Sequence, residues 1–229
     1  MKGILSRPQR YWVLAIAAIL VCGCADYDQR LSGAARYEAA GAEKIAVVSF
    51  ERVRPPDPSL SYVHSPLSGT FIRVCDGENG TEAIVEEQFV DRLKTSDSYL
   101  VIPSDKAGGV YKRMSALSFR ASPREILRAA GKELGADLVV MGYLYCYRER
   151  KGYSYSVEQP ASVAFSIHLI RVSDGAIVWN GLFDETQSSL MENVFHASSF
   201  FKGGGKWLTA EELSRQGVDE LLKTFPRME

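Results

Sequence analysis

The chain has 229 residues, and its 27 Lys and Arg residues nearly balance its 28 Asp and Glu residues, leaving a formal net charge of −1 at pH 7. The absence of a basic excess argues against nucleic acid as a partner. Beyond the amino terminus, no segment is apolar over the roughly 20 residues that a membrane-spanning helix needs. The remaining length and the average apolar and charged fractions are typical of one globular domain.

Residues 1–23 have the parts of a bacterial lipoprotein signal peptide. Basic side chains precede an apolar run over residues 11–21, which is about half as long as a membrane span. The sequence Val21-Cys22-Gly23-Cys24 resembles the bacterial lipobox, whose last cysteine becomes the lipid-modified amino terminus. We therefore expect acyl chains such as palmitate on Cys24, and Ala25 favours the outer membrane, facing the periplasm. The alternative is cleavage by the ordinary signal peptidase, without lipidation.

Residues 24–43 are rich in Ala, Gly and polar side chains and lack a sustained apolar stripe, so we expect a flexible tether. It would hold a single domain, residues 44–229, close to its membrane. Within that domain the cysteines are Cys75 and Cys146. The cell envelope permits disulfides. A Cys75–Cys146 bridge and two buried unpaired cysteines both stay open, because spacing in sequence says nothing about proximity in space.

The domain is predicted to open with a strand at residues 44–50, whose nearly continuous apolar run is typical of a central strand covered on both faces. Residues 54–80 are rich in Pro, Gly and Ser and form a long loop. Loops of this length are often functional, the alternative being a plain surface excursion. A helix at residues 81–95, a second strand at 99–102 and a weaker helix around 110–117 follow.

The sequence Ser122-Pro123-Arg124-Glu125 gives the clearest helix signal, because it combines an N-cap, proline at the first helical position and a capping-box glutamate. Gly135 is expected to end this helix. A third strand is predicted over residues 136–147. Residues 163–172 alternate between apolar and polar side chains, which predicts a half-buried strand.

Asp174-Gly175 predicts a two-residue hairpin that leads into a strand at residues 176–183. The last helix is predicted to start at Thr209, again with a capping box, and to close at Pro226. Helices between the early strands imply parallel crossovers, whereas the late strands form an antiparallel meander. The expected fold is therefore α/β, with a mixed parallel and antiparallel sheet of about five strands and helices packed on it.

Two segments carry a family resemblance. They are the strand entry Leu134-Gly135-Ala136-Asp137, followed by an apolar run to Gly142, and the hairpin over residues 170–179. In this order after a lipobox, over roughly residues 44–184, they resemble the envelope proteins with a TolB amino-terminal-type fold, the CsgG and LpoB group. Residues 54–80 depart from that pattern.

The resemblance implies a non-enzymatic adaptor that acts in cell-envelope assembly or regulation by binding an envelope protein. The alternative it leaves open is a subunit of an oligomeric outer-membrane secretion channel of the curli-secretion type.

The sequence contains no motif of a known catalytic or metal site. There is no HExxH, CxxC or GxSxG motif. Gly203-Gly204-Gly205-Lys206 matches a P-loop only in part, because Trp207 stands where Ser or Thr would bind magnesium. The histidines lie in different elements, without ligand spacing: His64, His168 and His196. We therefore expect neither enzymatic activity nor a cofactor or metal.

Five tyrosines are the remaining unusual feature. Tyr143, Tyr145 and Tyr147 alternate along one strand, and Tyr153 and Tyr155 follow a charged turn. Tyrosine is enriched at binding surfaces because it combines contact area with a hydrogen bond. These residues and the 54–80 loop are therefore predicted to form a partner surface. The alternative is cross-strand aromatic pairing that stabilises the hairpin.

Overall fold

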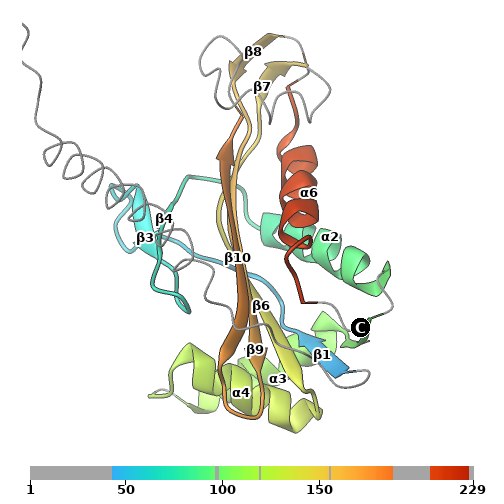
Figure 1. The fold of residues 1–229 in the computed structure, drawn as a ribbon. Helices are drawn as coiled ribbons and strands as arrows, with labels where there is room; N and C mark the ends of the chain where they lie inside the picture. The colour runs from blue at the N-terminus through green and yellow to red at the C-terminus, as the bar shows by residue number, and fades with distance from the viewer. Residues whose placement is uncertain (1–42, 96–97, 119, 155, 188–206, 227–229) are drawn as a thin grey trace, which may run out of the picture. The chain divides into compact units, whose positions relative to one another are not determined.

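The computed structural model describes residues 43–95, 98–118, 120–154, 156–187 and 207–226 (Figure 1). All of them belong to one compact unit, which spans Arg36–Glu229. The expected signal peptide, Cys24 and the tether lie outside the described residues. In the part of the chain that is described, no helix is both long and apolar enough to cross a membrane.

The described strands form one main sheet and two small ones. The main sheet consists of β1 (Glu43–Val47), β2 (Glu51–Arg52), β5 (Tyr99–Ile102), β6 (Leu138–Arg148), β9 (Ser162–Arg171) and β10 (Ile177–Thr186). The two-stranded sheets are β3 (Tyr62–His64) with β4 (Phe71–Arg73), and β7 (Lys151–Tyr153) with β8 (Ser156–Gln159). The helices are α2 (Thr81–Thr95), α3 (Ser104–Leu117), α4 (Pro123–Leu134) and α6 (Ala210–Leu221).

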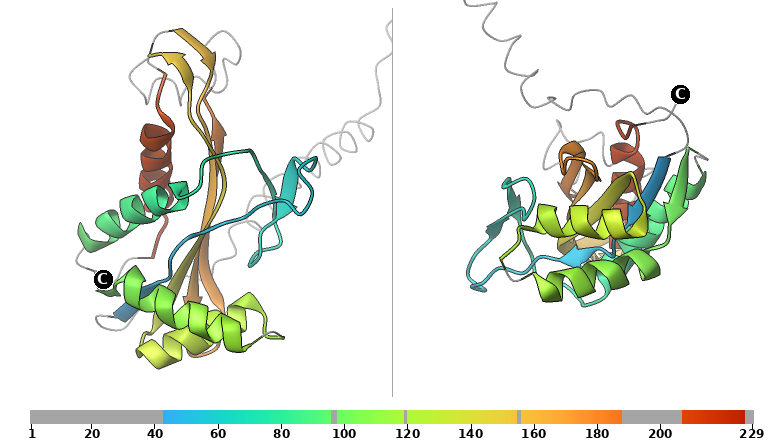
Figure 2. Two further views of the ribbon diagram at one scale, coloured as in Figure 1. Left: turned by 180° about the vertical axis from the view of Figure 1, so that it is seen from behind. Right: turned by 90° about the horizontal axis from the view of Figure 1, so that it is seen from below.

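The main sheet has the strand order β10-β9-β6-β1-β5, with β2 paired to β6 beyond the end of β1. β1 runs parallel to both of its neighbours, β5 and β6, whereas β6, β9 and β10 are antiparallel. Helices α2 and α6 pack on one face of this sheet and α3 and α4 on the other (Figure 2). The predicted α/β class and the mixed sheet with packed helices are confirmed.

Two hydrophobic cores lie on opposite faces of the sheet. The core under α2 and α6 includes Ile45, Val47, Val85, Phe89, Leu213 and Val218. The core under α3, α4 and the 54–80 segment includes Ala46, Val48, Ile72, Ala107, Leu127 and Met141. Because successive residues of β1 enter alternate cores, this strand is buried on both faces, as its continuous apolar run predicted.

Local signals place the starts of α4 and α6 and the end of α4 correctly, whereas α6 ends at Leu221, before the predicted close at Pro226. The Ser122 hydroxyl accepts a hydrogen bond from the Glu125 amide and the Glu125 carboxylate accepts one from the Ser122 amide, so the predicted capping box of α4 is confirmed. Gly135 ends this helix with φ 62°, in the left-handed region that favours glycine. Thr209 and Glu212 form the same box at α6. Helix α3 begins earlier than predicted, at Ser104.

Strand β9 differs from the prediction. Residues 162–170 are buried on both faces, because β9 lies between β10 and β6 with a core on each side. The expectation of a half-buried strand was therefore wrong. The turn that follows is also wider than two residues: the Arg171 amide donates to the Ala176 carbonyl oxygen at 2.9 Å, which leaves four residues between them. Gly175 has φ 77° in this turn.

The segment 54–80, predicted as a long loop, contains regular structure of its own. Strands β3 and β4 form an antiparallel hairpin within it, with Val63 opposite Ile72. Both side chains are buried in the core under α3 and α4. The segment therefore covers part of the sheet. The hairpin was not predicted from the sequence, because each of its strands is only three residues long and the alternation of apolar and polar side chains is too short to indicate a strand.

Candidate functional site

The tyrosines of β6 lie inside the protein. Tyr143, Tyr145 and Tyr147 are 2%, 0% and 7% exposed. The prediction that they form a partner surface therefore does not hold for these three side chains, which are part of the fold's interior. Tyr153, in β7, is 83% exposed, and Tyr155 lies outside the described residues.

A β-bulge explains why strict alternation of side chains along β6 does not place its three tyrosines on one face. The pairing of β6 with β9 shifts register between Leu144 and Cys146, so Tyr145 is the extra residue. Tyr145 remains in the core under α3 and α4, but Tyr147 moves to the opposite core, under α2 and α6. Both faces of the strand are covered, so neither placement leaves a tyrosine exposed.

A buried chain of polar groups runs from β6 into β9. The Tyr145 hydroxyl lies 3.0 Å from Ser166 Oγ, which in turn lies 2.9 Å from His168 Nε2. The other ring nitrogen of His168, Nδ1, has no hydrogen-bond partner within the residues that the structure describes. Burial lowers the pKa of His168 to about 4, because the charged form is desolvated. This histidine thus has a buried polar role. The described residues contain no cluster of three His, Cys, Asp or Glu side chains that would suit a metal.

The carboxyl-terminal part of the 54–80 segment is fixed to β6. Cys75 and Cys146 are joined by a disulfide across a sequence separation of 71 residues. The Cys75 amide also donates to the Tyr145 carbonyl oxygen at 3.3 Å, and the Val74 amide donates to Ser61 at 2.9 Å. Of the two alternatives that the sequence left open, the structure has the bridge. The β3–β4 hairpin is therefore held against the sheet covalently as well as by its buried residues.

The outer side of that hairpin exposes aromatic rings. Tyr62 is 57% exposed and Phe71 is 67% exposed. Phe71 pairs across the strands with His64, and their ring centroids lie 3.9 Å apart. We call Tyr62, His64 and Phe71 the hairpin face. Beside it Arg73 forms an ion pair with Asp184 of β10 at 2.6 Å, which orients the hairpin toward the edge of the main sheet.

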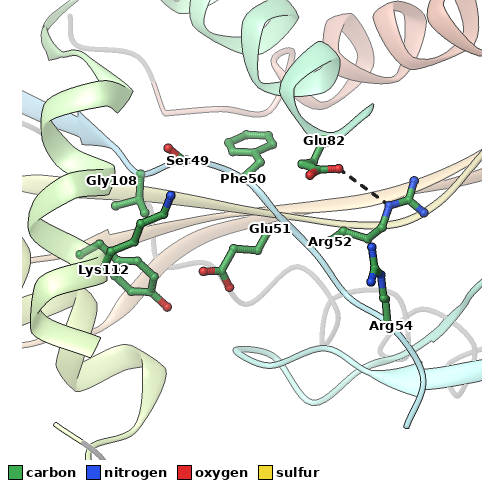
Figure 3. A pocket seen from close by; sticks show the side chains of 10 residues that line it. Ser49, Phe50, Glu51, Arg52, Arg54, Glu82, Gly108 and Lys112 are labelled. Atoms are coloured by element: carbon green, nitrogen blue, oxygen red, sulfur yellow. Dashed lines mark ion pairs between the residues drawn. The ribbon is translucent and has the colours of Figure 1, made fainter. Parts of the chain in front are cut away.

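A crevice lies where β1 ends. It has a volume of about 470 Å³ and is lined by residues 48–52 and by side chains from α2, α3 and the start of the 54–80 segment (Figure 3). The backbone there is held to α2, because the Phe50 amide donates to the Glu86 carboxylate at 2.8 Å. Helix α3 approaches closely at Gly108, where a Cβ atom would lie 2.5 Å from Ser49 Oγ.

Charged groups of both signs face this crevice. The Arg52 side chain is only 8% exposed; it donates to Thr81 Oγ1 at 2.7 Å, and its Nε lies 3.8 Å from a Glu82 oxygen. Burial lowers the pKa of Arg52. The negative charge of Glu82 acts to raise this pKa, and the positive charge of Arg54 acts to lower it further. Burial raises the pKa of Glu51, against the effect of Lys112. Apart from Arg54, which begins the predicted partner loop, no residue of this crevice was predicted as a site from the sequence, because its lining comes from separate segments.

Burial also raises the pKa of Tyr111, on α3, to about 12, and nearby Glu51 acts in the same direction. The Tyr111 hydroxyl therefore stays protonated at neutral pH and offers a hydrogen-bond donor at the crevice. The partial P-loop glycines and lysine at residues 203–206 and His196, both considered above, lie outside the described residues.

No protein-family model matches the chain, and no curated protein matches it. Several solved structures do match the chain. A PelC dodecamer from Paraburkholderia phytofirmans is 14% identical, with 85% of this chain and 95% of that chain covered and a TM-score of 0.44. Lipoprotein GNA1162 from Neisseria meningitidis is 17% identical, with 70% and 96% covered and a TM-score of 0.37.

The LpoB C-terminal domain from Salmonella enterica is 16% identical, with 65% of this chain and 87% of that chain covered and a TM-score of 0.37. Identities and scores this low carry no function from one protein to the other. LpoB, a member of the envelope-protein group that the sequence resembles, is thus among the solved structures to which this chain is similar.

Proposed function

We propose that this protein is a lipid-anchored accessory protein of the cell envelope, facing the periplasm, that acts by binding another envelope protein. The observation that carries the proposal is the Cys75–Cys146 disulfide, which ties a covering segment to the core. Such bonds persist in oxidising compartments and are rare in the cytosol of mesophiles. Together with the lipobox at Cys24, the bridge supports export followed by anchoring at a membrane, with the outer membrane favoured by Ala25.

The hairpin face supports binding of a partner protein. Its aromatic rings, Tyr62 and Phe71, are exposed although the hairpin beneath them is fixed by buried Val63 and Ile72 and by the disulfide. Aromatic side chains concentrate binding energy at interfaces. A rigid backbone loses little entropy when a partner binds, so more of that contact energy contributes to affinity. The partner role predicted for the 54–80 segment is thus assigned to one side of its hairpin.

Anchoring is tested by Cys24→Ser. The variant should incorporate no radiolabelled palmitate and should leave the membrane fraction, because the last cysteine of the lipobox is the residue that is lipidated. Cys22→Ser is the matched control, since that cysteine precedes the expected cleavage site, and it should be labelled like the parent protein. Undiminished labelling of Cys24→Ser would contradict the anchor.

Partner binding is tested by crosslinking in native envelopes, with the double variant Tyr62→Ser/Phe71→Ser. Loss of two interface aromatics, at about 2 kcal/mol each, should abolish recovery of the partner. The melting temperature should change little, since both rings are exposed. Leu117→Ser, which removes a 73% exposed apolar side chain from α3, is the control and should bind normally. Equal recovery by both variants would contradict the assignment.

The oligomeric state would distinguish the proposed role from the alternative. An accessory protein should run in mild detergent as a monomer or small oligomer, whereas a stable ring would favour a secretion-channel subunit.

A further inference from the structure

The crevice at the end of β1 occupies a special position in the sheet. Helix α2 connects β1 to β5 across one face, whereas α3 and α4 connect β5 to β6 across the other. The two connections therefore diverge at the carboxyl end of β1. In open α/β sheets, ligands bind in the crevice outside the carboxyl ends of the strands at such a switch point. Its volume of about 470 Å³ is in the range of small-molecule sites.

The cations around the crevice come from three different segments. Arg52 lies in β2, Arg54 begins the 54–80 segment and Lys112 is on α3 (Figure 3). Arg52 is the unusual one, because its side chain is more than nine-tenths buried and yet its Nε has no hydrogen-bond acceptor among the described residues. A carboxylate oxygen of Glu82 lies 3.8 Å from it, and in the described part of the chain that oxygen likewise has no hydrogen-bond donor. A buried charged donor without an acceptor is costly, and native proteins rarely keep one without a use.

We propose that this crevice binds the oxyanion group of a small ligand, a carboxylate or a phosphate, through Arg52, Arg54 and Lys112. Guanidinium groups present several N–H donors in a plane that matches such oxygens, and Lys112 adds a point charge from the opposite side. The first turn of α2, at Glu82, borders the same space, and the amino-terminal end of a helix favours negative charge. This site is independent of the proposed partner surface on the hairpin face.

Glu51 sets the affinity of the site. Its side chain lies between Lys112 on one side and Arg52 and Arg54 on the other (Figure 3). An incoming oxyanion therefore competes with this carboxylate for the same cations. Partial burial already disfavours the charged form of Glu51, as its raised pKa shows. Glu51→Gln should consequently bind an oxyanion more tightly than the parent chain, an effect that general loss of structure would not produce.

The test is calorimetric titration of the full chain in detergent micelles with inorganic phosphate and, separately, with succinate. At least one should bind at low millimolar concentration. Arg54→Gln and Lys112→Gln should each weaken binding about tenfold, the loss expected for one charge-assisted contact. Lys106→Gln is the matched control, since Lys106 is exposed on the same helix and does not line the crevice. Both variant side chains are exposed, and the hydrogen bond that Arg54 donates to Asn79 is exposed as well, so the melting temperature should change little.

Binding of phosphate alone assigns a phosphorylated ligand, and binding of succinate alone assigns a carboxylate; either supports the proposal. Binding of neither, or equal weakening by Lys106→Gln, overturns it. Failure here leaves the hairpin-face proposal untouched, because that proposal is tested by crosslinking and not by anion binding.

Discussion

Removing the Cys75–Cys146 bridge should destabilise the protein strongly. The bond closes a loop with a sequence separation of 71 residues, and the conformational entropy that such a loop removes from the unfolded chain corresponds to about 4 kcal/mol of stability. For a domain of this length the loss should lower the melting temperature by roughly 10 °C. The bridge fixes the 54–80 segment to β6, so reduction should also make that segment more sensitive to protease.

The measurement is urea denaturation with and without a reducing agent, followed by fluorescence of buried Trp179. Cys22→Ser/Cys24→Ser serves as the background, so that Cys75 and Cys146 are the only thiols that can report. A further Cys75→Ala/Cys146→Ala variant should match the reduced protein and should not respond to reductant. Two titratable thiols in unfolded, non-reduced protein, or a loss of stability below about 1 kcal/mol, would refute the reasoning.

Acid should destabilise the fold through His168, whose pKa burial lowers to about 4. The unfolded chain takes up this proton near pH 6.5, whereas the folded chain does so only near pH 4. The free energy of unfolding is therefore about 2 kcal/mol lower at pH 5 than above pH 6.5. In urea denaturation, His168→Phe should show a shallower dependence of stability on pH. Gly217→Ala would place a Cβ atom 2.7 Å from the Phe183 ring, and overpacking should cost about 1–3 kcal/mol in the same assay. In Gly109→Ala the added Cβ atom has no atom of the described residues within 4 Å, so this variant should be neutral or slightly stabilising.

The elements set by local interactions were predictable from sequence. The capping boxes at Ser122 and Thr209 each involve residues three apart, so the helix starts could be read directly. The parallel early strands followed from the helices between them. The face of each β6 tyrosine was not predictable, because a bulge at Tyr145 arises from the pairing with β9 and leaves no mark in the alternation of β6.

The crevice could not be assembled from the sequence for a related reason. Arg52 and Lys112 are far apart along the chain, and they line the same crevice because α3 packs against β1. One signal was present: Glu51 and Arg52 directly follow a strand that is buried on both faces, and charged residues at the carboxyl end of such a strand often face a ligand site. The sequence places residues 51–53 between a predicted strand and a predicted loop and assigns them to neither.

The central position of β1 has a mechanical consequence. This strand is the first described element after the expected tether, and it is hydrogen-bonded to β5 on one side and to β6 on the other. At its start, the Lys44 amide donates to the Asp137 carboxylate at 3.0 Å and the Asp137 amide donates back to the Lys44 carbonyl oxygen at 2.9 Å. A pull along the strand axis therefore loads two ladders in shear, so their bonds must yield together. An edge strand, by contrast, would peel away one bond at a time.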